Sequence, residues 1–129
     1  MGTVKSFEDL VVWSKSMDLI EKIYQITKTP PFCKDFGLVD QIRRASISIA
    51  ANIAEGMERD GNKELINFLF IAKGSCGELI CHLHIARRLE YINMLLFEEI
   101  CNFAIEISKA LGKFIHYLKE SGLKGKKYK

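Results

Sequence analysis

The chain has 129 residues, 48% of them hydrophobic and 27% charged, with a formal net charge of +3 at neutral pH. This length fits one domain with its own core, and the composition is that of an ordinary globular protein rather than a low-complexity one. No apolar run reaches the roughly 18 residues of a membrane span, and the first residues lack the apolar segment of a signal peptide. The sequence therefore predicts a cytoplasmic protein without a membrane segment.

The first predicted helix covers residues 7–28. Ser6 followed by Asp9 is a capping signal, because the serine oxygen accepts hydrogen bonds from early backbone amides and the acid complements the helix dipole. Apolar residues then recur every three or four positions and form one seam: Leu10, Trp13, Met17, Ile20 and Tyr24. Pro30-Pro31 ends the helix, since proline disfavours helical geometry in the residue before it.

The second predicted helix, residues 38–59, is the expected centre of the fold. Between residues 41 and 59 it is apolar or small on nearly every side, which is typical of a buried helix. One polar stripe at helical spacing interrupts this surface: Gln41, Arg44, Ser48, Asn52, Glu55 and Arg59. The cluster Asp60-Gly61-Asn62 that follows is a strong turn signal, so we expect the next helix to return antiparallel to this one.

Two further helices are predicted at residues 63–89 and 96–120. The inward seam of the third helix is expected to contain Leu65, Phe68, Ala72, Ser75, Leu79, Leu83 and Ala86. Asn93 is a candidate N-terminal cap for the fourth helix. Gly122 is a natural position for its C-terminal end.

Four helices joined by short connections predict an all-α fold, an antiparallel up-and-down four-helix bundle. We expect the bundle to occupy residues 1–122 and a basic tail to occupy residues 123–129. The tail holds four lysines and no acid, so the remainder of the chain carries a formal charge of −1. A nucleic-acid-binding domain usually carries its positive charge on a folded face, and here the excess lies on the tail.

The polar stripe of the second helix is expected to face the third helix across the turn. The facing pairs predicted from this register are Arg44 with Glu78, Ser48 with Ser75, and Glu55 with Asn67. A buried Arg-Glu pair fixes helix register, because leaving one charge alone commonly costs about 3–5 kcal/mol. We therefore predict a structural polar network made of Arg44, Ser48, Asn52, Glu55, Arg59 and Glu78. No pair of nucleophile and base accompanies it, which favours a structural role over catalysis.

Four strings of residues make the chain resemble a known family: FEDLVVW at 7–13, GLVDQIRRA at 37–45, SIAANIAEG at 48–56 and FLFIAKGSCGEL at 68–79. It resembles the four-helix bundle family whose members include proteins encoded in intervening sequences of bacterial large-subunit ribosomal RNA genes, often labelled ribosomal-protein-like. A related branch is the accessory protein of diversity-generating retroelements, a pentameric barrel that works with a reverse transcriptase and RNA. The resemblance implies a homo-oligomer, a pentamer by analogy with that branch, with RNA or a reverse-transcriptase-type protein as partner.

The string Cys81-His82-Leu83-His84 suggests a metal site that helical geometry disfavours. The two histidines diverge by about 200° around a helix, so they cannot share one metal locally. Glu78 and His82 can, but a bundle di-metal site needs two Glu-x-x-His motifs and two further glutamates. The four cysteines of the chain form neither a C-x-x-C pair nor a dense framework, which indicates reduced thiols. We expect no metal and no cofactor.

Two sets of basic residues are candidate contacts to the phosphates of a nucleic acid. They are Arg87 and Arg88 at the end of the third helix, and the tail lysines Lys124, Lys126, Lys127 and Lys129. A competing interpretation is a solvated helix end and a solvated tail, because cations near a helix C-terminus complement its dipole. Self-association would favour the first interpretation, since several tails around one assembly turn weak contacts into useful binding.

No Gly-rich phosphate loop, catalytic triad or paired-carboxylate signature is visible in the sequence. The predicted function is therefore that of a non-enzymatic, self-associating helical scaffold, with RNA or a ribonucleoprotein as candidate partner. The alternative is a purely protein-binding or structural oligomer without nucleic acid. Ligand counting disfavours a metal enzyme in the bundle core, and no small-molecule substrate is evident.

Overall fold

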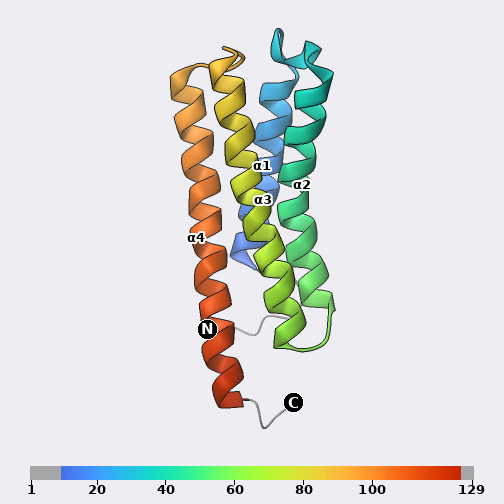
Figure 1. Cartoon of the computed structure of the whole chain (residues 1–129), viewed down its shortest axis with the longest axis vertical. Coiled ribbons are helices and arrows are strands. Elements are labelled where there is room, and N and C mark those ends of the chain that lie inside the picture. The colour runs from blue at the N-terminus through green and yellow to red at the C-terminus, as the bar shows by residue number, and fades with distance from the viewer. Residues whose placement is uncertain (1–9, 126–129) are drawn as a thin grey trace.

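The computed structural model describes residues 10–125, with side chains up to residue 121, and it confirms the all-α fold class. Within that range the chain forms α1 (Val11–Thr27), the 3-10 helix η2 (Phe32–Lys34), α2 (Phe36–Glu58), α3 (Asn62–Arg88) and α4 (Met94–Gly125). The four α-helices stand side by side and alternate in direction, as expected for an up-and-down bundle (Figure 1).

Connections between helices lie at both ends of the bundle. The α1–α2 and α3–α4 connections share one end, and the α2–α3 turn lies at the opposite end (Figure 1). Helices adjacent in sequence pack together, α2 against α3 most extensively, and α1 closes the bundle against α4. At the end that holds the α2–α3 turn, the last turns of α4 extend beyond the other helices (Figure 1). The outer surface of α4 is therefore accessible over much of its length.

α1 begins later than the sequence predicts. It starts at Val11, and no side chain caps its first turn. The capping signal at Ser6 and Asp9, and with it the predicted helix start, lies outside the described residues. The helix ends at Thr27, shortly before Pro30-Pro31, as the proline rule predicts.

Side-chain caps set where α2 and α4 begin, whereas the end of α4 differs from the prediction. α2 starts two residues earlier than predicted, because the carboxylate of Asp35 accepts a hydrogen bond from the backbone N–H of Leu38 at 3.1 Å. Asn93 caps α4 as predicted, its side-chain oxygen accepting from a backbone N–H of the first turn at 2.8 Å. α4 does not end near Gly122 but continues to Gly125, since one glycine inside a helix costs only about 1 kcal/mol.

The core consists of aliphatic side chains that recur at three- and four-residue spacing on each helix. The seam predicted for α1 is wrong: Met17 is 40% exposed and the other four residues are only half-buried, whereas the buried side of α1 holds Val12, Leu19, Ile23 and Ile26. The largest fully buried side chains include Leu19 and Ile23 of α1, Ile42, Ile49 and Ile53 of α2, Leu69, Leu79 and Leu83 of α3, and Ile100, Ile107 and Leu111 of α4. The expectation that α2 is enclosed on nearly all sides is wrong. In a bundle of four helices each helix keeps an outer face, and on α2 that face exposes Arg44, Ile47 and Ala51.

Tyr91 ties together the two connections at their shared end of the bundle. Its hydroxyl donates to Asp35 Oδ2 at 2.8 Å, and its ring stacks on Phe32 with the ring centroids 5.0 Å apart. The hydrogen bond to Asp35 raises the pKa of the Tyr91 hydroxyl. Glu90, just before it, adopts φ 64, and the backbone N–H groups of both residues bond to carbonyls in the last turn of α3. This left-handed cap ends α3.

Candidate interaction surfaces

The polar stripe of α2 does not form one buried network. The Arg44 side chain is 76% exposed, and its Nε donates to Oδ2 of Asp40 on the same helix at 2.9 Å. Glu78 is exposed on α3 and makes no ion pair with any side chain in the described range. The predicted buried pair of Arg44 with Glu78 is therefore wrong. Both residues lie on outer faces, where water solvates a charge and an i, i+4 partner is within easier reach.

The middle of the stripe holds α2 against α3. The hydroxyl oxygens of Ser48 and Ser75 lie 2.8 Å apart in a hydrogen bond between the two helices, which confirms the predicted facing of these residues. Asn52 Nδ2 donates to the backbone carbonyl and the hydroxyl of Ser48, at 2.8 and 2.9 Å. Two turns further on, Gly56 lets the helices approach so closely that a Cβ there would lie 2.9 Å from Cβ of Phe68.

The last part of the stripe forms a cluster at the α2–α3 turn. Arg59 Nε donates to Glu55 Oε2 at 2.8 Å, and one Nη of Arg59 lies 3.7 Å from Glu64. The guanidinium also lies 5.0 Å from the centroid of the Phe68 ring. The hydrogen bond with Glu55 is the main reason that the pKa of Arg59 is raised. Asn67, the expected neighbour of Glu55, lies instead on the exposed side of α3. The cluster holds the turn in place.

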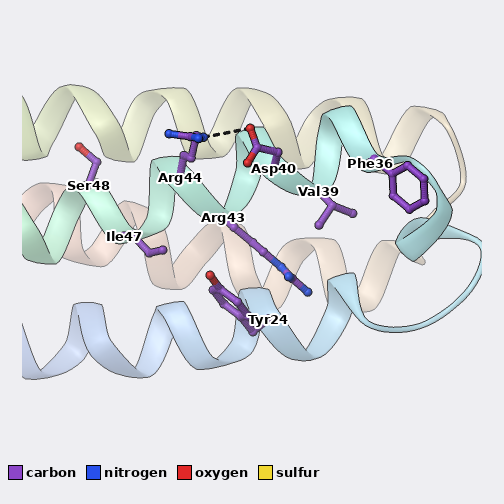
Figure 2. A pocket seen from close by; sticks show the side chains of 8 residues that line it. All are labelled: Tyr24, Phe36, Val39, Asp40, Arg43, Arg44, Ile47 and Ser48. Carbon is purple, nitrogen blue, oxygen red and sulfur yellow. Dashed lines mark hydrogen bonds and ion pairs between the residues drawn. The ribbon is translucent and has the colours of Figure 1, made fainter.

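An open groove of about 610 Å³ lies between α1 and the first half of α2 (Figure 2). It is lined by Tyr24, Phe36, Val39, Asp40, Arg43, Arg44, Ile47 and Ser48. Figure 2 shows Arg43 reaching toward α1, whereas Arg44 turns toward Asp40. Arg43 Nε donates to Thr27 Oγ1 at 2.9 Å, and its guanidinium carbon lies 4.2 Å above the Tyr24 ring. The groove thus contains an arginine that joins two helices, and its lining pairs no nucleophile with a general base.

Sequence reasoning did not single out Arg43, although it identified its neighbour Arg44. The available signal was position: a helix turns by about 100° per residue, so adjacent arginines point to different sides. Which of the two would reach α1 depended on where α1 packs, and that is a property of the tertiary structure.

α3 keeps apolar surface that the bundle does not cover. By length and composition alone this helix is apolar enough to span a membrane, with a mean hydropathy of 1.2 over its most apolar 18 residues, yet only 33% of that stretch is buried. We name its outer surface the α3 face, which comprises Asn67, Phe70, Ile71, Gly74, Gly77, Glu78, Cys81 and Ile85. Phe70 is 47% exposed and Ile71 is 51% exposed. A Cβ added at Gly74 or Gly77 would meet nothing within 4 Å.

The sequence of this helix contains a second apolar stripe, which the prediction of a single inward seam did not include. Phe70, Ile71, Gly74, Cys81 and Ile85 recur at helical spacing, on the side opposite the buried leucines. Two apolar stripes on opposite sides of one helix cannot both face a core of four helices. The second stripe must therefore lie on the surface or in an interface.

The thiols and imidazoles of the bundle do not gather into a metal site. No group of three or more metal-ligating side chains occurs within the described ranges, and the cysteines there are free. His84 packs edge-on against Phe97, with the ring centroids 4.9 Å apart. Burial raises the pKa of the Cys76 thiol to about 12, so this thiol stays protonated at neutral pH and is a poor nucleophile.

The structure separates the two sets of basic residues that the sequence suggested as phosphate contacts. Arg87 and Arg88 lie in the last turn of α3, at the end of the bundle where α4 begins, and Nε of Arg87 is buried without a hydrogen-bond partner. Lys124 belongs to the last turn of α4 at the opposite end, about 45 Å along the helix. Lys126, Lys127 and Lys129 lie outside the described residues. Arg87 and Arg88 therefore lie at the opposite end of the bundle from the helix position of Lys124.

The fold defines the class of this protein, an up-and-down four-helix bundle whose described residues form no catalytic constellation. The model of the 23S rRNA-intervening sequence protein family matches residues 8–113. The chain belongs to that family, which confirms the resemblance seen in the sequence. A comparison with curated protein sequences finds no match.

A solved structure shares the fold. It is the crystal structure of a protein with unknown function from the S23 ribosomal protein family of Bacteroides thetaiotaomicron. The two chains are 33% identical and superpose with a TM-score of 0.75, over 81% of this chain and 98% of the other. Neither the family description nor this structure's description states an enzymatic activity.

Proposed function

We propose that this protein is a non-enzymatic scaffold of the cytoplasm that self-associates through the α3 face and has RNA or a ribonucleoprotein as its partner. One observation carries the self-association: the most apolar 18-residue stretch of α3 is only 33% buried within the chain. Apolar side chains that gather on one exposed face mark protein–protein contact sites. The occupant we propose is a second copy of the same chain.

The glycines of the α3 face support a helix as the object that covers it. Gly74 and Gly77 leave the α3 backbone bare between Ile71 and Ile85, because nothing in the same chain lies within 4 Å of either missing Cβ. A helix interior normally disfavours glycine by about 1 kcal/mol relative to alanine, so packing inside one chain gives no reason for two of them here. Close approach of another backbone supplies the reason.

The number of subunits and the class of partner come from the family. Resemblance to the accessory protein of diversity-generating retroelements favours a pentamer. The ribosomal-protein-like family to which the chain belongs favours RNA, or a protein that works on RNA, over a small-molecule substrate. The alternative, an oligomer that binds only protein, predicts the same α3 contact without nucleic acid.

The test of self-association compares Ile71→Glu with Leu95→Glu by sedimentation velocity. Both residues are exposed in the single chain, so either glutamate is compatible with the fold, but only Ile71 belongs to the α3 face. We expect the wild type and Leu95→Glu to sediment as oligomers and Ile71→Glu to sediment as a monomer. A monomeric wild type, or an Ile71→Glu variant that assembles like the wild type, would refute the proposed contact.

Native mass spectrometry of untagged protein, purified without nuclease, tests the class of partner. Oligomers that carry RNA are expected from the proposal. Oligomers that carry no RNA would favour the protein-binding alternative. A number of subunits other than five would rule out the pentamer.

A further inference from the structure

We infer that the outer side of the C-terminal half of α4 holds the phosphate backbone of a single-stranded nucleic acid. This surface, named the α4 basic face, consists of Lys109, Lys113, Tyr117 and Lys119 on the described helix. The inference rests on the nucleic-acid half of the proposed function and gives it a location. Lys119 borders the α3 face through the Phe70 ring, so the test of this inference changes Lys109 and Lys113 instead.

Charge along the chain is segregated more strongly than the net value suggests. The last 23 residues contain seven lysines and one glutamate, a formal charge of +6, so the first 106 residues together carry −3. Within α4, the acidic residues Glu98, Glu99 and Glu106 precede Lys109, Lys113 and Lys119, and Glu120 is the one acid that follows them. An excess of positive charge toward one end of a helix presents a localised positive potential to a polyanion.

The lysines of the α4 basic face form no ion pair with a described carboxylate, unlike Lys15 and Lys22. Lys15 on α1 pairs with Glu106 at 2.7 Å, and Lys22 pairs with Glu99 at 3.3 Å, both across the α1–α4 seam. Lys109 and Lys113 are exposed and form no ion pair with any described residue. Their charges are therefore available to phosphates without first breaking a salt bridge.

Geometry places these charges along one line. Lys109 and Lys113 are four residues apart, so they lie on the same side of α4, about 6 Å apart along its axis. Lys119 lies on the flank toward α3, where its Nζ is 5.1 Å from the centroid of the Phe70 ring. α4 continues past Gly122 to Gly125, so the helix extends beyond this line.

An exposed aromatic ring accompanies the lysines. Tyr117 is 61% exposed and lies one turn after Lys113 on the same helix. Proteins that bind single strands combine a positive surface that follows the backbone with aromatic side chains on which bases stack. The ring and the two nearest lysines supply both elements, which favours a single strand over a duplex whose bases are already stacked.

A membrane surface fits α4 less well. Helices that lie on membranes insert an apolar face between the lipids. The apolar face of α4 in this region, formed by Leu111, Ile115 and Leu118, is buried in the bundle and is not free to insert. The end of the bundle that holds Arg88 also fits phosphates less well, because Glu90, Glu98 and Glu99 lie at that end.

The test is fluorescence anisotropy of a fluorescein-labelled oligouridylate titrated with full-length protein over a series of salt concentrations. We expect the logarithm of the binding constant to fall linearly with the logarithm of the salt concentration. Each phosphate neutralised on a single strand should contribute about −0.7 to the slope of that line. The double variant Lys109→Gln, Lys113→Gln should lower the slope by about 1.4 and weaken Kd about 10- to 100-fold at low salt. The charge-matched control is Lys28→Gln, Lys34→Gln, exposed lysines at the opposite end, and we expect less than about a threefold change for it.

Each outcome decides the inference. Absence of wild-type binding to the oligouridylate, or equal losses in both double variants, would overturn it, the second because binding would then follow only net charge. Binding to phosphatidylserine vesicles but not to RNA would overturn it in favour of a lipid surface. Sedimentation of the same samples separates the inference from the assembly proposal. A monomer that binds RNA removes the α3 contact alone. An oligomer that does not bind RNA removes the α4 basic face and counts against the RNA half of the proposed function, but it leaves the α3 contact in place.

Discussion

Gly56 offers a direct test of how closely α2 and α3 approach. Replacing glycine by alanine inside a helix normally stabilises it by about 1 kcal/mol, because alanine restricts the unfolded chain and favours helical geometry. At Gly56 the added Cβ would lie 2.9 Å from Cδ1 of Leu65 and 2.9 Å from Cβ of Phe68. The leucine methyl can rotate away, but the phenylalanine Cβ moves only with its backbone. Steric repulsion therefore acts against the gain in helix propensity.

The change in the free energy of unfolding is the difference between the steric cost and the gain in helix propensity. Inserting a methyl group into a well-packed site typically costs about 1–3 kcal/mol, and relief of such a contact here requires α2 and α3 to separate. Because the contact with Phe68 Cβ is relieved only by a backbone shift, the cost lies in the upper part of that range, about 2–3 kcal/mol. Subtracting the gain in propensity leaves Gly56→Ala less stable than the wild type by roughly 1–2 kcal/mol. For a domain of this length that corresponds to a fall in Tm of about 3–8 °C.

The assay is thermal unfolding followed by far-ultraviolet circular dichroism, with Gly112→Ala as the matched control. Gly112 lies in the middle of α4, and its missing Cβ would be 3.4 Å from Cε of Lys73, a flexible side chain that can move aside. We expect Gly112→Ala to raise Tm by a few degrees, in the opposite direction to Gly56→Ala. A Gly56→Ala variant as stable as Gly112→Ala would refute the close approach of α2 and α3.

Three further predictions concern Glu90, Tyr91 and the thiols. Glu90→Gly should raise stability by about 1 kcal/mol in thermal unfolding, because φ 64 strains any residue with a Cβ. Tyr91→Phe should lower Tm most at pH values below the ordinary tyrosine pKa near 10, because the bond to Asp35 raises that pKa in the fold. The Tyr91–Asp35 bond stabilises the fold fully below the pKa that Tyr91 has in the unfolded chain. This stabilisation is lost as the pH rises through the higher pKa that Tyr91 has in the folded protein, and Tm measured against pH will show the loss. In the Ile71→Glu variant, expected to be monomeric with an open α3 face, Cys81 should react with a thiol reagent at mildly alkaline pH much faster than Cys76, whose pKa is about 12, as peptide mass mapping will show.

Controls distinguish these effects from general destabilisation. Glu98→Gly, at an exposed helical position of α4, should lower Tm, whereas a Glu90→Gly variant that also lowered it would contradict the left-handed cap. A Tm difference between wild type and Tyr91→Phe that stays constant across pH 10 would exclude the Tyr91–Asp35 bond as its cause. Labelling of Cys76 at the rate of Cys81 would show that Cys76 is not buried as described.

The four helices and much of their register were predictable because the information for them is local. Leucine and isoleucine at three- and four-residue spacing predict the buried side of α2 and α3, although the seam predicted for α1 is displaced from its buried side. A proline pair or a turn such as Asp60-Gly61-Asn62 limits the length of a helix. The facing of Ser48 and Ser75 follows from the position of that turn, because two antiparallel helices of equal rise meet residue by residue on either side of it.

The surfaces were less predictable, since periodicity identifies residues that share a side of a helix but not what lies opposite them. The sequence shows a polar stripe that contains Arg44, and only the placement of α1 and α3 shows that this side chain is exposed and pairs with Asp40. The same placement directs Arg43 across the groove onto Tyr24 and Thr27. Rotations of a few tens of degrees about a helix axis decide such contacts, and no local propensity sets them.

By itself, the sequence determined that this chain is an all-α bundle of the 23S rRNA-intervening sequence protein family, because helix periodicity and family strings are properties of the chain alone. Only the tertiary structure decided which surfaces remain exposed. The α3 face is left bare and the α4 basic face is unpaired because four helices packed around one core bury one side of each helix and leave the other to solvent.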